Sequence, residues 1–358
     1  MDVSAKITGV TYTTFLCRGL EIFSINDFEY ALSNSASFIL KISENRQVAV
    51  SWWVSPKRTR SYPYARVYDT LSFQGKKITI IPILKDEGKE GDRDFLQWDT
   101  ISLMSLLGVY TIVSYYDNAE QSSRYTQKIT NQRFDMNHLK GEINNLLSYQ
   151  SDALHWNLDQ IDKVGIIGGK ALNSYAAISE KLGVEMHSKE SAEHRILELL
   201  KGKENFMILS RKLAEEAQKR EVITVQPKEN LVSDTKATLT IQNYLGGLYY
   251  FTADEIHIEN DNLFLIEGKH SKQSLIPSLG DIKDGLVKMI LFTNLKEVKI
   301  GDKEYSPIAV LKLTSETEFS KTLLSKSQLK QLQTLKEEAE KNNFLVVVND
   351  TDLRNLKI

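Results

Sequence analysis

The 358-residue sequence is short of cysteine, of long apolar runs and of net charge. Cys17 is its only cysteine, so neither an intrachain disulfide nor a cysteine-based zinc site can form. No apolar stretch approaches the roughly 20 residues that a membrane-spanning helix needs. The first residues also lack the basic-then-apolar pattern of a secretory signal. These absences favour a reducing, cytoplasmic location.

The formal net charge is −2, which excludes a histone-like polycation that binds nucleic acid without selectivity. A DNA enzyme with a local basic cleft remains compatible with this charge, because metal-binding carboxylates offset part of the positive charge. The six histidines show no metal-ligand spacing. The segment GIIGGK at 165–170 lacks the spacing of a phosphate-binding loop, which excludes nucleotide hydrolysis.

Hydrophobic patterning predicts a mixed α/β fold with two domains. Residues 1–140 are expected to form a strand-rich N-terminal domain that contributes DNA recognition or dimerisation. Residues 141–358 are expected to hold a helical region and a C-terminal core, in which helices flank a mixed central sheet. Within the first domain we expect strands at 35–43, 46–55, 65–73, 76–86 and 109–116, and a helix at 100–108.

The segment 252–272 has the pattern of a β-hairpin. Its strands would span 254–258 and 263–269, joined by a polar turn. If Ile258 pairs with Leu263, the antiparallel register can be extended residue by residue toward the open end of the hairpin.

That register sets Asp254 opposite Glu267, with Cβ atoms roughly 4.5–5.5 Å apart. Two carboxylates this close repel each other unless a cation lies between them. Lys269 follows two residues after Glu267 and therefore lies on the same face. Paired carboxylates beside an ammonium group suit Mg²⁺ binding and phosphodiester hydrolysis.

This hairpin resembles the PD-(D/E)xK nuclease superfamily, which includes many type II restriction endonucleases. The residues that carry the resemblance are Asp254, Glu267 and Lys269, followed by a helix expected at 279–294. The resemblance covers about 246–314. Ala253 stands where many members have proline before the aspartate.

The resemblance implies a restriction-endonuclease-like core and a division of roles. Asp254, Glu267 and the carbonyl of Gly268 would hold one or two Mg²⁺ ions, and Lys269 would orient the attacking water and stabilise the developing charge. It implies a type II restriction endonuclease that breaks both strands of DNA at a specific short sequence and leaves 5′-phosphate ends. The implied partners are double-stranded DNA and a second copy of the chain, with a cognate DNA methyltransferase in the same system that is not a physical partner.

Three other interpretations remain open. Glu267 and Lys269 could be an ordinary exposed pair at a strand end, because Glu-x-Lys is frequent in a chain this rich in charge. The chain could be a repair or modification-dependent DNase of the same superfamily. It could also be a DNA-binding protein without catalysis that keeps only the hairpin fold.

Basic residues suggest where DNA is contacted. In SWWVSPKRTRSYPYARVY, arginine and lysine alternate with aromatic residues around prolines, as in a loop that reaches into DNA; a surface loop anchored by its tryptophans is the alternative. Lys272, just after the hairpin, and Lys288, in the helix expected after it, are further candidates for phosphate contacts. The candidate DNA-binding residues are Lys57, Arg58, Arg60, Arg66, Lys272 and Lys288.

A second acidic cluster, from Asp86 to Asp99, faintly resembles a nuclease core together with Asp69 and Lys85. It lacks a Glu-x-Lys on the preceding strand, because Ile83 stands where the acid should be. The cluster could be a degenerate second nuclease-like fold or a cation-binding loop. We favour a solvated turn in which Asp99 caps the following helix.

Overall fold

The computed structural model describes residues 2–57, 62–200, 235–243, 248–317 and 321–356. They form a mixed α/β fold with one large mixed sheet and several smaller sheets, which confirms the expected fold class. None of the described helices has both the length and the apolar character needed to span a bilayer.

The chain divides into two compact units that are interleaved in sequence. The unit that contains the hairpin, called the hairpin unit below, comprises Met1–Leu20, Tyr64–Gln74 and Gln226–Ile358. The middle unit comprises Glu21–Pro63 and Gly75–Val225. This division differs from the single boundary expected near residue 140.

The hairpin unit is built on an eight-stranded sheet, in which the pairings of six strands form a closed cycle and β16 and β17 continue from β15. β13 pairs with β12 on one side and, in parallel, with β15 on the other. From β12 the pairings continue through β11, β1 and β14 to β15, which completes the cycle. The strands are β1 (Asp2–Ile7), β11 (Thr235–Asn243), β12 (Leu248–Glu259), β13 (Asn262–Ser271), β14 (Lys296–Ile300), β15 (Lys303–Ser315), β16 (Leu345–Val348) and β17 (Thr351–Asp352).

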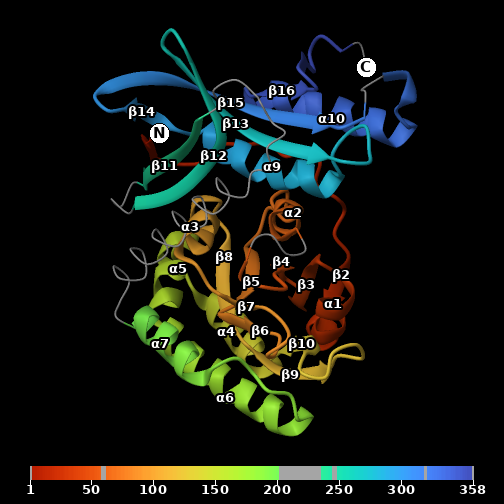
Figure 1. Cartoon of the computed structure of the whole chain (residues 1–358), viewed down its shortest axis with the longest axis vertical. Coiled ribbons are helices and arrows are strands. Elements are labelled where there is room, and N and C mark those ends of the chain that lie inside the picture. Colours follow the sequence, from red (N-terminus) through yellow and green to blue (C-terminus); the bar gives the residue numbers. More distant parts are fainter. Residues whose placement is uncertain (1, 58–61, 201–234, 244–247, 318–320, 357–358) are drawn as a thin grey trace. The chain divides into compact units, whose positions relative to one another are not determined.

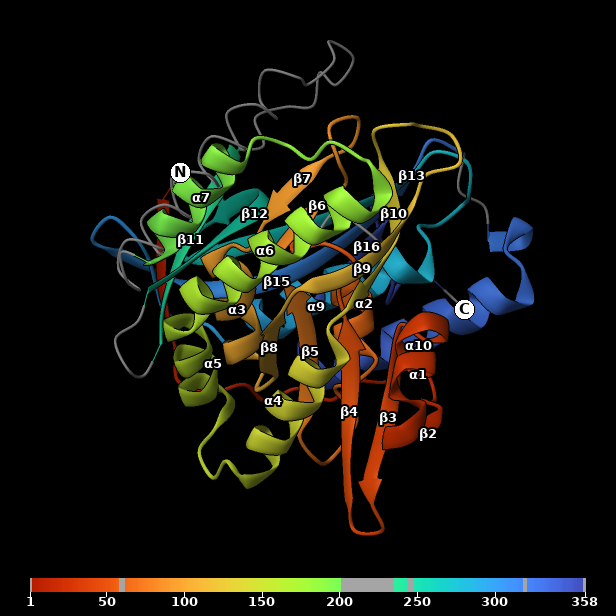
Figure 2. The ribbon, with the colours of Figure 1, turned by 90° about the horizontal axis from the view of Figure 1, so that it is seen from below.

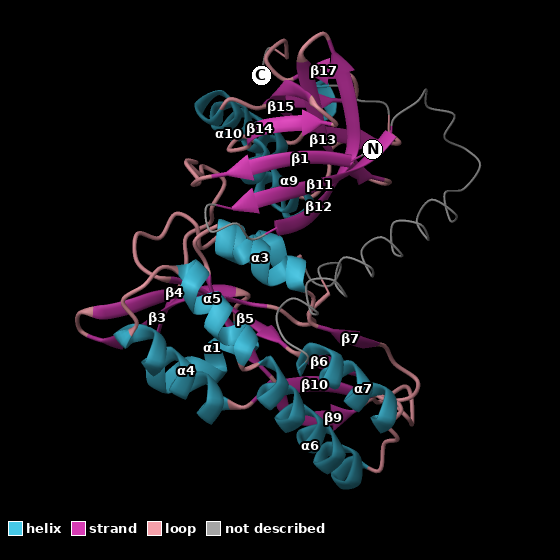
Figure 3. Cartoon of the chain, turned by 90° about the vertical axis from the view of Figure 1, so that its left-hand side faces the viewer, coloured by secondary structure: helices cyan, strands magenta, loops and turns pink. Residues whose placement is uncertain are grey.

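The N-terminal strand β1 completes this sheet, far from its neighbours in sequence. It runs parallel to β11 and antiparallel to β14, and Figure 3 shows it beside β11. Its residues alternate strictly between exposed and buried positions, with Val3, Ala5 and Ile7 inward. This period of two is the pattern of a half-buried strand, so the first residues belong to the hairpin unit.

Segment 64–74 joins the hairpin unit through buried polar contacts. α2 (Pro63–Tyr68) begins with proline, which suits the first position of a helix, and buries Tyr64, Val67 and Tyr68 at helical spacing. The strand expected at 65–73 is therefore wrong. Tyr68 donates from its hydroxyl to the Glu338 carboxylate at 2.7 Å, and Asp69 pairs with Lys283 at 2.5 Å.

Two long helices complete the hairpin unit. α9 (Leu279–Phe292) packs against β13 and β15, and α10 (Lys326–Asn342) packs against β16 (Figure 1). Both helices start with a capping box, in which Ser278 and Ser325 are the N-caps. A short 3₁₀ turn, η2 (Lys321–Leu323), precedes α10.

The middle unit is built on a five-stranded sheet in the order β2-β3-β4-β5-β8. β3 and β4 form an antiparallel hairpin, and β4, β5 and β8 are parallel (Figure 2). Two small antiparallel pairs, β6–β7 and β9–β10, accompany it. The strands are β2 (Ile22–Ser24), β3 (Ser37–Ser43), β4 (Arg46–Trp52), β5 (Lys77–Pro82), β6 (Leu84–Asp86), β7 (Arg93–Phe95), β8 (Tyr110–Ser114), β9 (Tyr116–Gln121) and β10 (Ile129–Phe134).

Helices cover this sheet and the β9–β10 pair. α3, α4 and α5 pack against β8, whereas α6 packs against β9 and α7. The helices are η1 (Ile25–Asp27), α1 (Phe28–Asn34), α3 (Trp98–Leu106), α4 (Met136–Ser148), α5 (Ala153–Asp162), α6 (Val164–Leu182) and α7 (Lys189–Leu200). The helical character expected after residue 141 is confirmed up to residue 200; the rest of that region lies outside the described residues.

Candidate functional site: a carboxylate–lysine cluster on the hairpin

The β12–β13 hairpin has the register that the sequence predicts. Ile258 pairs with Leu263, and the ladder runs to the pair Glu255–Ile266. Asp254 is the next residue on one strand and Glu267 the next on the other, so the two carboxylates lie across from each other. The turn is tighter than expected, because Glu259 pairs with Asn262 and leaves two residues in the loop.

Five side chains from the hairpin and from α9 gather at this point, and we call them the carboxylate–lysine cluster. The hairpin supplies three of them and one face of α9 supplies the other two, four residues apart. They are Asp254, Glu267, Lys269, Asp284 and Lys288.

Glu267 is the centre of the cluster and is only 1% exposed. Its Oε1 lies 3.0 Å from Lys269 Nζ, and its Oε2 lies 2.9 Å from Lys288 Nζ. Lys269 Nζ lies 2.5 Å from Asp284 Oδ2 as well. A buried carboxylate is tolerated only when its charge is compensated, and here two ammonium groups compensate it.

Asp254 is half-buried and is held by the backbone of the partner strand. The Gly268 N–H donates to Asp254 Oδ2 at 3.0 Å. The other oxygen, Asp254 Oδ1, takes no part in this hydrogen bond. Burial, and next the negative charge of Glu267, raise the pKa of Asp254 despite the nearby lysines.

Lys269 is held as an ammonium ion. Burial alone would lower its pKa, but the carboxylates of Glu267 and Asp284 outweigh burial and raise the pKa above the usual value. Lys269 is therefore suited to stabilise negative charge and to orient a water molecule, and unsuited to accept a proton at neutral pH.

The close approach of α9 to β13 depends on Gly285. A Cβ atom at this position would lie 2.6 Å from Leu311 Cδ1 and 3.3 Å from Lys269 Cε. Neither Gly285 nor the pairing role of Asp284 was predicted from the sequence. A glycine inside an otherwise regular helix is the signal that could have revealed a close contact.

The cluster fits a hard divalent cation in its ligand chemistry. Asp254 and Glu267 offer carboxylate oxygens beside the backbone of Gly268, and such oxygens are the ligands that Mg²⁺ prefers. Among the described residues, no group of three or more His, Cys, Asp or Glu side chains is arranged to hold a metal. A site here would therefore rest on two carboxylates, backbone oxygen and water.

The described candidate DNA-binding residues are distributed over both units. Arg58 and Arg60 lie outside the described residues. Lys57 is exposed in the middle unit, 4.0 Å from Asp94, whereas Arg66 lies on α2 in the hairpin unit. Lys272 is exposed just after β13.

Lys288 occupies a different environment from the one expected for a phosphate contact. It is 3% exposed, pairs with Glu267 and donates to the Thr252 carbonyl at 2.5 Å. It is part of the cluster rather than of an exposed DNA-facing surface, because the helix face that carries it packs on the hairpin.

The second acidic cluster is a solvated turn only in part: Glu90 and Asp92 are exposed, whereas its first two acids are not. Asp86 and Glu87 are buried at 4% and 8% exposure. Glu87 pairs with Lys85 at 2.7 Å and with Lys128 at 3.1 Å, so the local charges are compensated within the middle unit.

Asp86 and Asp94 have partners within the middle unit as well. Asp86 Oδ1 lies 2.8 Å from His187 Nδ1. Asp94 accepts a hydrogen bond from Ser55 at 2.7 Å. Asp99 lies in the first turn of α3, whose N-cap is Gln97, so the expected capping role is wrong.

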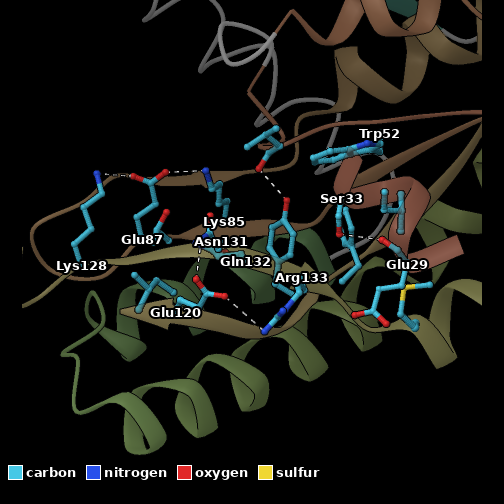
Figure 4. Close-up of a pocket in the computed structure, with 17 residues that line it drawn as sticks. Glu29, Ser33, Trp52, Lys85, Glu87, Glu120, Lys128, Asn131, Gln132 and Arg133 are labelled. Carbon is cyan, nitrogen blue, oxygen red and sulfur yellow. Dashed lines mark hydrogen bonds and ion pairs between the residues drawn. The ribbon is translucent and has the colours of Figure 1, made fainter. Parts of the chain in front are cut away.

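A pocket of about 610 Å³ opens beside this cluster in the middle unit (Figure 4). Figure 4 shows the chain of charges from Lys128 through Glu87 to Lys85 along one side. Acids and bases are present in equal number on its wall, so the pocket favours neither sign of charge. The charged residues that line it are Glu29, Lys85, Glu87, Glu120, Lys128 and Arg133.

Comparison of the chain with known protein families, with curated proteins and with solved structures finds no match.

Proposed function

We propose that this protein is a Mg²⁺-dependent DNA endonuclease of the restriction type. The observation that carries the proposal is the hairpin register, which sets Asp254 beside Glu267, with Lys269 paired to the latter at 3.0 Å. Paired carboxylates with an ammonium group fixed beside them suit hydrolysis of a phosphodiester. The reaction would cut both strands at a specific short sequence and leave 5′-phosphate ends.

The residues of the cluster have separate roles in this proposal. Asp254, Glu267 and the carbonyl of Gly268 would hold one or two Mg²⁺ ions. When bound, Mg²⁺ supplies polarisation of the scissile phosphate and a lowered pKa for a bound water. Lys269, anchored by Asp284, orients the attacking water and stabilises the charge that develops on the phosphate.

Double-strand cleavage needs two active sites, so we propose a two-fold homodimer acting on double-stranded DNA. The middle unit, which carries the exposed Lys57, would contribute target recognition or dimerisation. We further propose a cytoplasmic location and a cognate DNA methyltransferase that protects host DNA without binding this chain.

The test is a digest of sequenced plasmids by the purified full-length protein, with Mg²⁺ and with EDTA. We expect discrete fragments that form only with Mg²⁺ and whose ends map to one short sequence. DNA that is bound in gel shifts but never cut would overturn the enzymatic proposal in favour of a DNA-binding protein.

A DNase of repair or modification-dependent type is the second candidate within the same chemistry. The same digest separates it from the restriction type. Cutting that ignores sequence, or that requires damaged or modified DNA, would support this candidate and contradict the restriction type.

A further inference from the structure

Lys288 bridges the two strands that carry the carboxylates. Its Nζ lies 2.9 Å from Glu267 Oε2 on β13 and donates to the Thr252 carbonyl on β12 at 2.5 Å. Thr252 precedes Asp254 by two residues on the same strand. The ammonium group is thus fixed on the oxygen of Glu267 that Lys269 does not contact.

A buried ion pair is an expensive way to join a helix to a hairpin, because both charges must leave water. Lys288 is 3% exposed and Glu267 is 1% exposed, so neither charge is hydrated to any large extent. Apolar residues in place of both Lys288 and Glu267 would join the helix to the hairpin at lower cost. The charged pair is therefore better explained by what the site has to bind.

The charges of the cluster limit how many further cations it can hold. Three carboxylates, from Asp254, Glu267 and Asp284, face two ammonium groups, so the cluster has a formal charge of −1. One divalent cation would bring this charge to +1, and two would bring it to +3. In a low-dielectric site such a surplus is strongly unfavourable.

We propose that Lys288 is the built-in second cation of this site, so that each chain binds one divalent metal ion and not two. This inference rests on the proposed function and narrows it. In enzymes with two metal ions, the pair of cations stabilises the attacking and leaving oxygens together. Here a lysine fixed by Glu267 and Thr252 takes one of the two positions.

Lys283 offers a matched control on the same helix. It is buried to the same degree, at 4% exposure, but its partner is Asp69 at 2.5 Å rather than a hairpin carboxylate. Removing either lysine deletes a buried ion pair of α9. Only removal of Lys288 takes a positive charge away from the metal-binding carboxylates.

The experiment is a titration of the full-length protein with Mn²⁺ alone, carried to saturation, in which free Mn²⁺ is followed by electron paramagnetic resonance. We expect one Mn²⁺ per chain for the wild type and for Lys283→Ala, and two for Lys288→Ala. Loss of the like charge should also tighten the first Mn²⁺ by roughly tenfold in Lys288→Ala. Circular dichroism verifies that each variant is folded.

Two Mn²⁺ per wild-type chain would overturn the inference without reference to any variant, and would leave the proposed nuclease intact. A single Mn²⁺ in a folded Lys288→Ala would overturn it too, because Lys288 would then not be what excludes the second ion. A wild-type protein that binds no Mn²⁺ would count against the proposed function itself.

Discussion

The tripeptide Glu-Gly-Lys occurs twice in this chain, once in each unit, and its lysine has a different ion-pair partner in each copy. In the hairpin unit, Glu267-Gly268-Lys269 lies within β13, and the lysine turns back onto its own glutamate at 3.0 Å. In the middle unit, Glu87 lies just after β6, and Lys89 pairs instead with Glu185 at 2.8 Å.

The glycine conformation explains the difference. Gly88 has a φ of 87°, which turns the chain out of the extended conformation. Residues two apart share a face only in a strand, so Glu87 is buried while the Lys89 side chain stays 60% exposed. In an extended strand, Glu-Gly-Lys brings its glutamate and lysine together in a buried cluster. At a turn, the lysine of the same tripeptide forms an exposed ion pair with another residue.

Replacing Lys269 or Lys89 with alanine is expected to give the largest difference between the two tripeptides. We expect Lys269→Ala to lose cutting by a factor on the order of 10³, because charge stabilisation at the phosphate is removed, while folding and DNA binding remain. Lys89→Ala should cut at the wild-type rate and lose less than about 1 kcal/mol of unfolding free energy. Plasmid cleavage rates measure both; equal rates for the two variants would show that the site is misassigned.

Gly285→Ala should damage the cluster through packing. The added methyl group would push against Leu311 and the Lys269 side chain, so we expect a stability loss of about 1–3 kcal/mol and slower cutting. Gly169→Ala in α6 is the control, since nothing lies within 4 Å of its Cβ position and alanine favours helices. Urea unfolding that shows no difference between the two variants would contradict the close approach of α9.

The two glycines of the repeated tripeptide should differ in their tolerance of alanine. Gly88→Ala is expected to cost about 1–3 kcal/mol, because its positive φ disfavours alanine and its Cβ would lie 2.7 Å from the Gln127 carbonyl oxygen. Gly268→Ala should cost little in stability, since its Cβ would meet only Asp254 Oδ2, at 3.8 Å. Thermal unfolding measures the stability loss of each variant. A larger loss for Gly268→Ala than for Gly88→Ala would contradict the backbone conformations of the two glycines.

The smallest expected effect is a pH dependence at Glu338, which ties α10 to the N-terminal segment. Burial raises the pKa of Glu338, although hydrogen bonds from Tyr68, Phe15 N–H and Tyr12 oppose it. A raised folded pKa means that the folded state retains the proton longer than the unfolded state does. The stability from this proton is complete below pH 4.5, the ordinary glutamate pKa, and is lost as the pH rises through the folded value.

Glu338→Gln cannot titrate, so it isolates this contribution. Its unfolding free energy relative to the wild type should shift in favour of the variant as the pH rises from below 4.5 toward neutrality. Urea unfolding across this range measures the shift. A difference that stays constant with pH would show that the carboxyl titrates alike in both states.

Local patterns were enough to predict the hairpin. Alternating polar and apolar residues, with a polar turn between them, define the hairpin and its register, and the register alone brings Asp254 to Glu267. The helix expected at 279–294, observed at Leu279–Phe292, and the later strands follow from hydrophobic spacing in the same way. The mixed α/β class follows from this alternation of elements.

What failed depended on contacts between distant segments. β1 completes a sheet whose other strands begin only at Thr235, and Tyr68 and Asp69 tie α2 and the residue after it to α10 and α9. Periodicity carries no information about such partners. The division of the chain into its two units could therefore not be read from a change in composition near residue 140.

The sequence by itself determined the hairpin, its register and the three residues Asp254, Glu267 and Lys269, because strand pairing across a short turn is a local property. Only the tertiary structure decided that α9 lies on this hairpin, so that Asp284 holds Lys269 and Lys288 holds Glu267. It also decided which Glu-Gly-Lys is buried as a cluster. The physical reason is that burial and charge pairing arise from segments that meet only after folding.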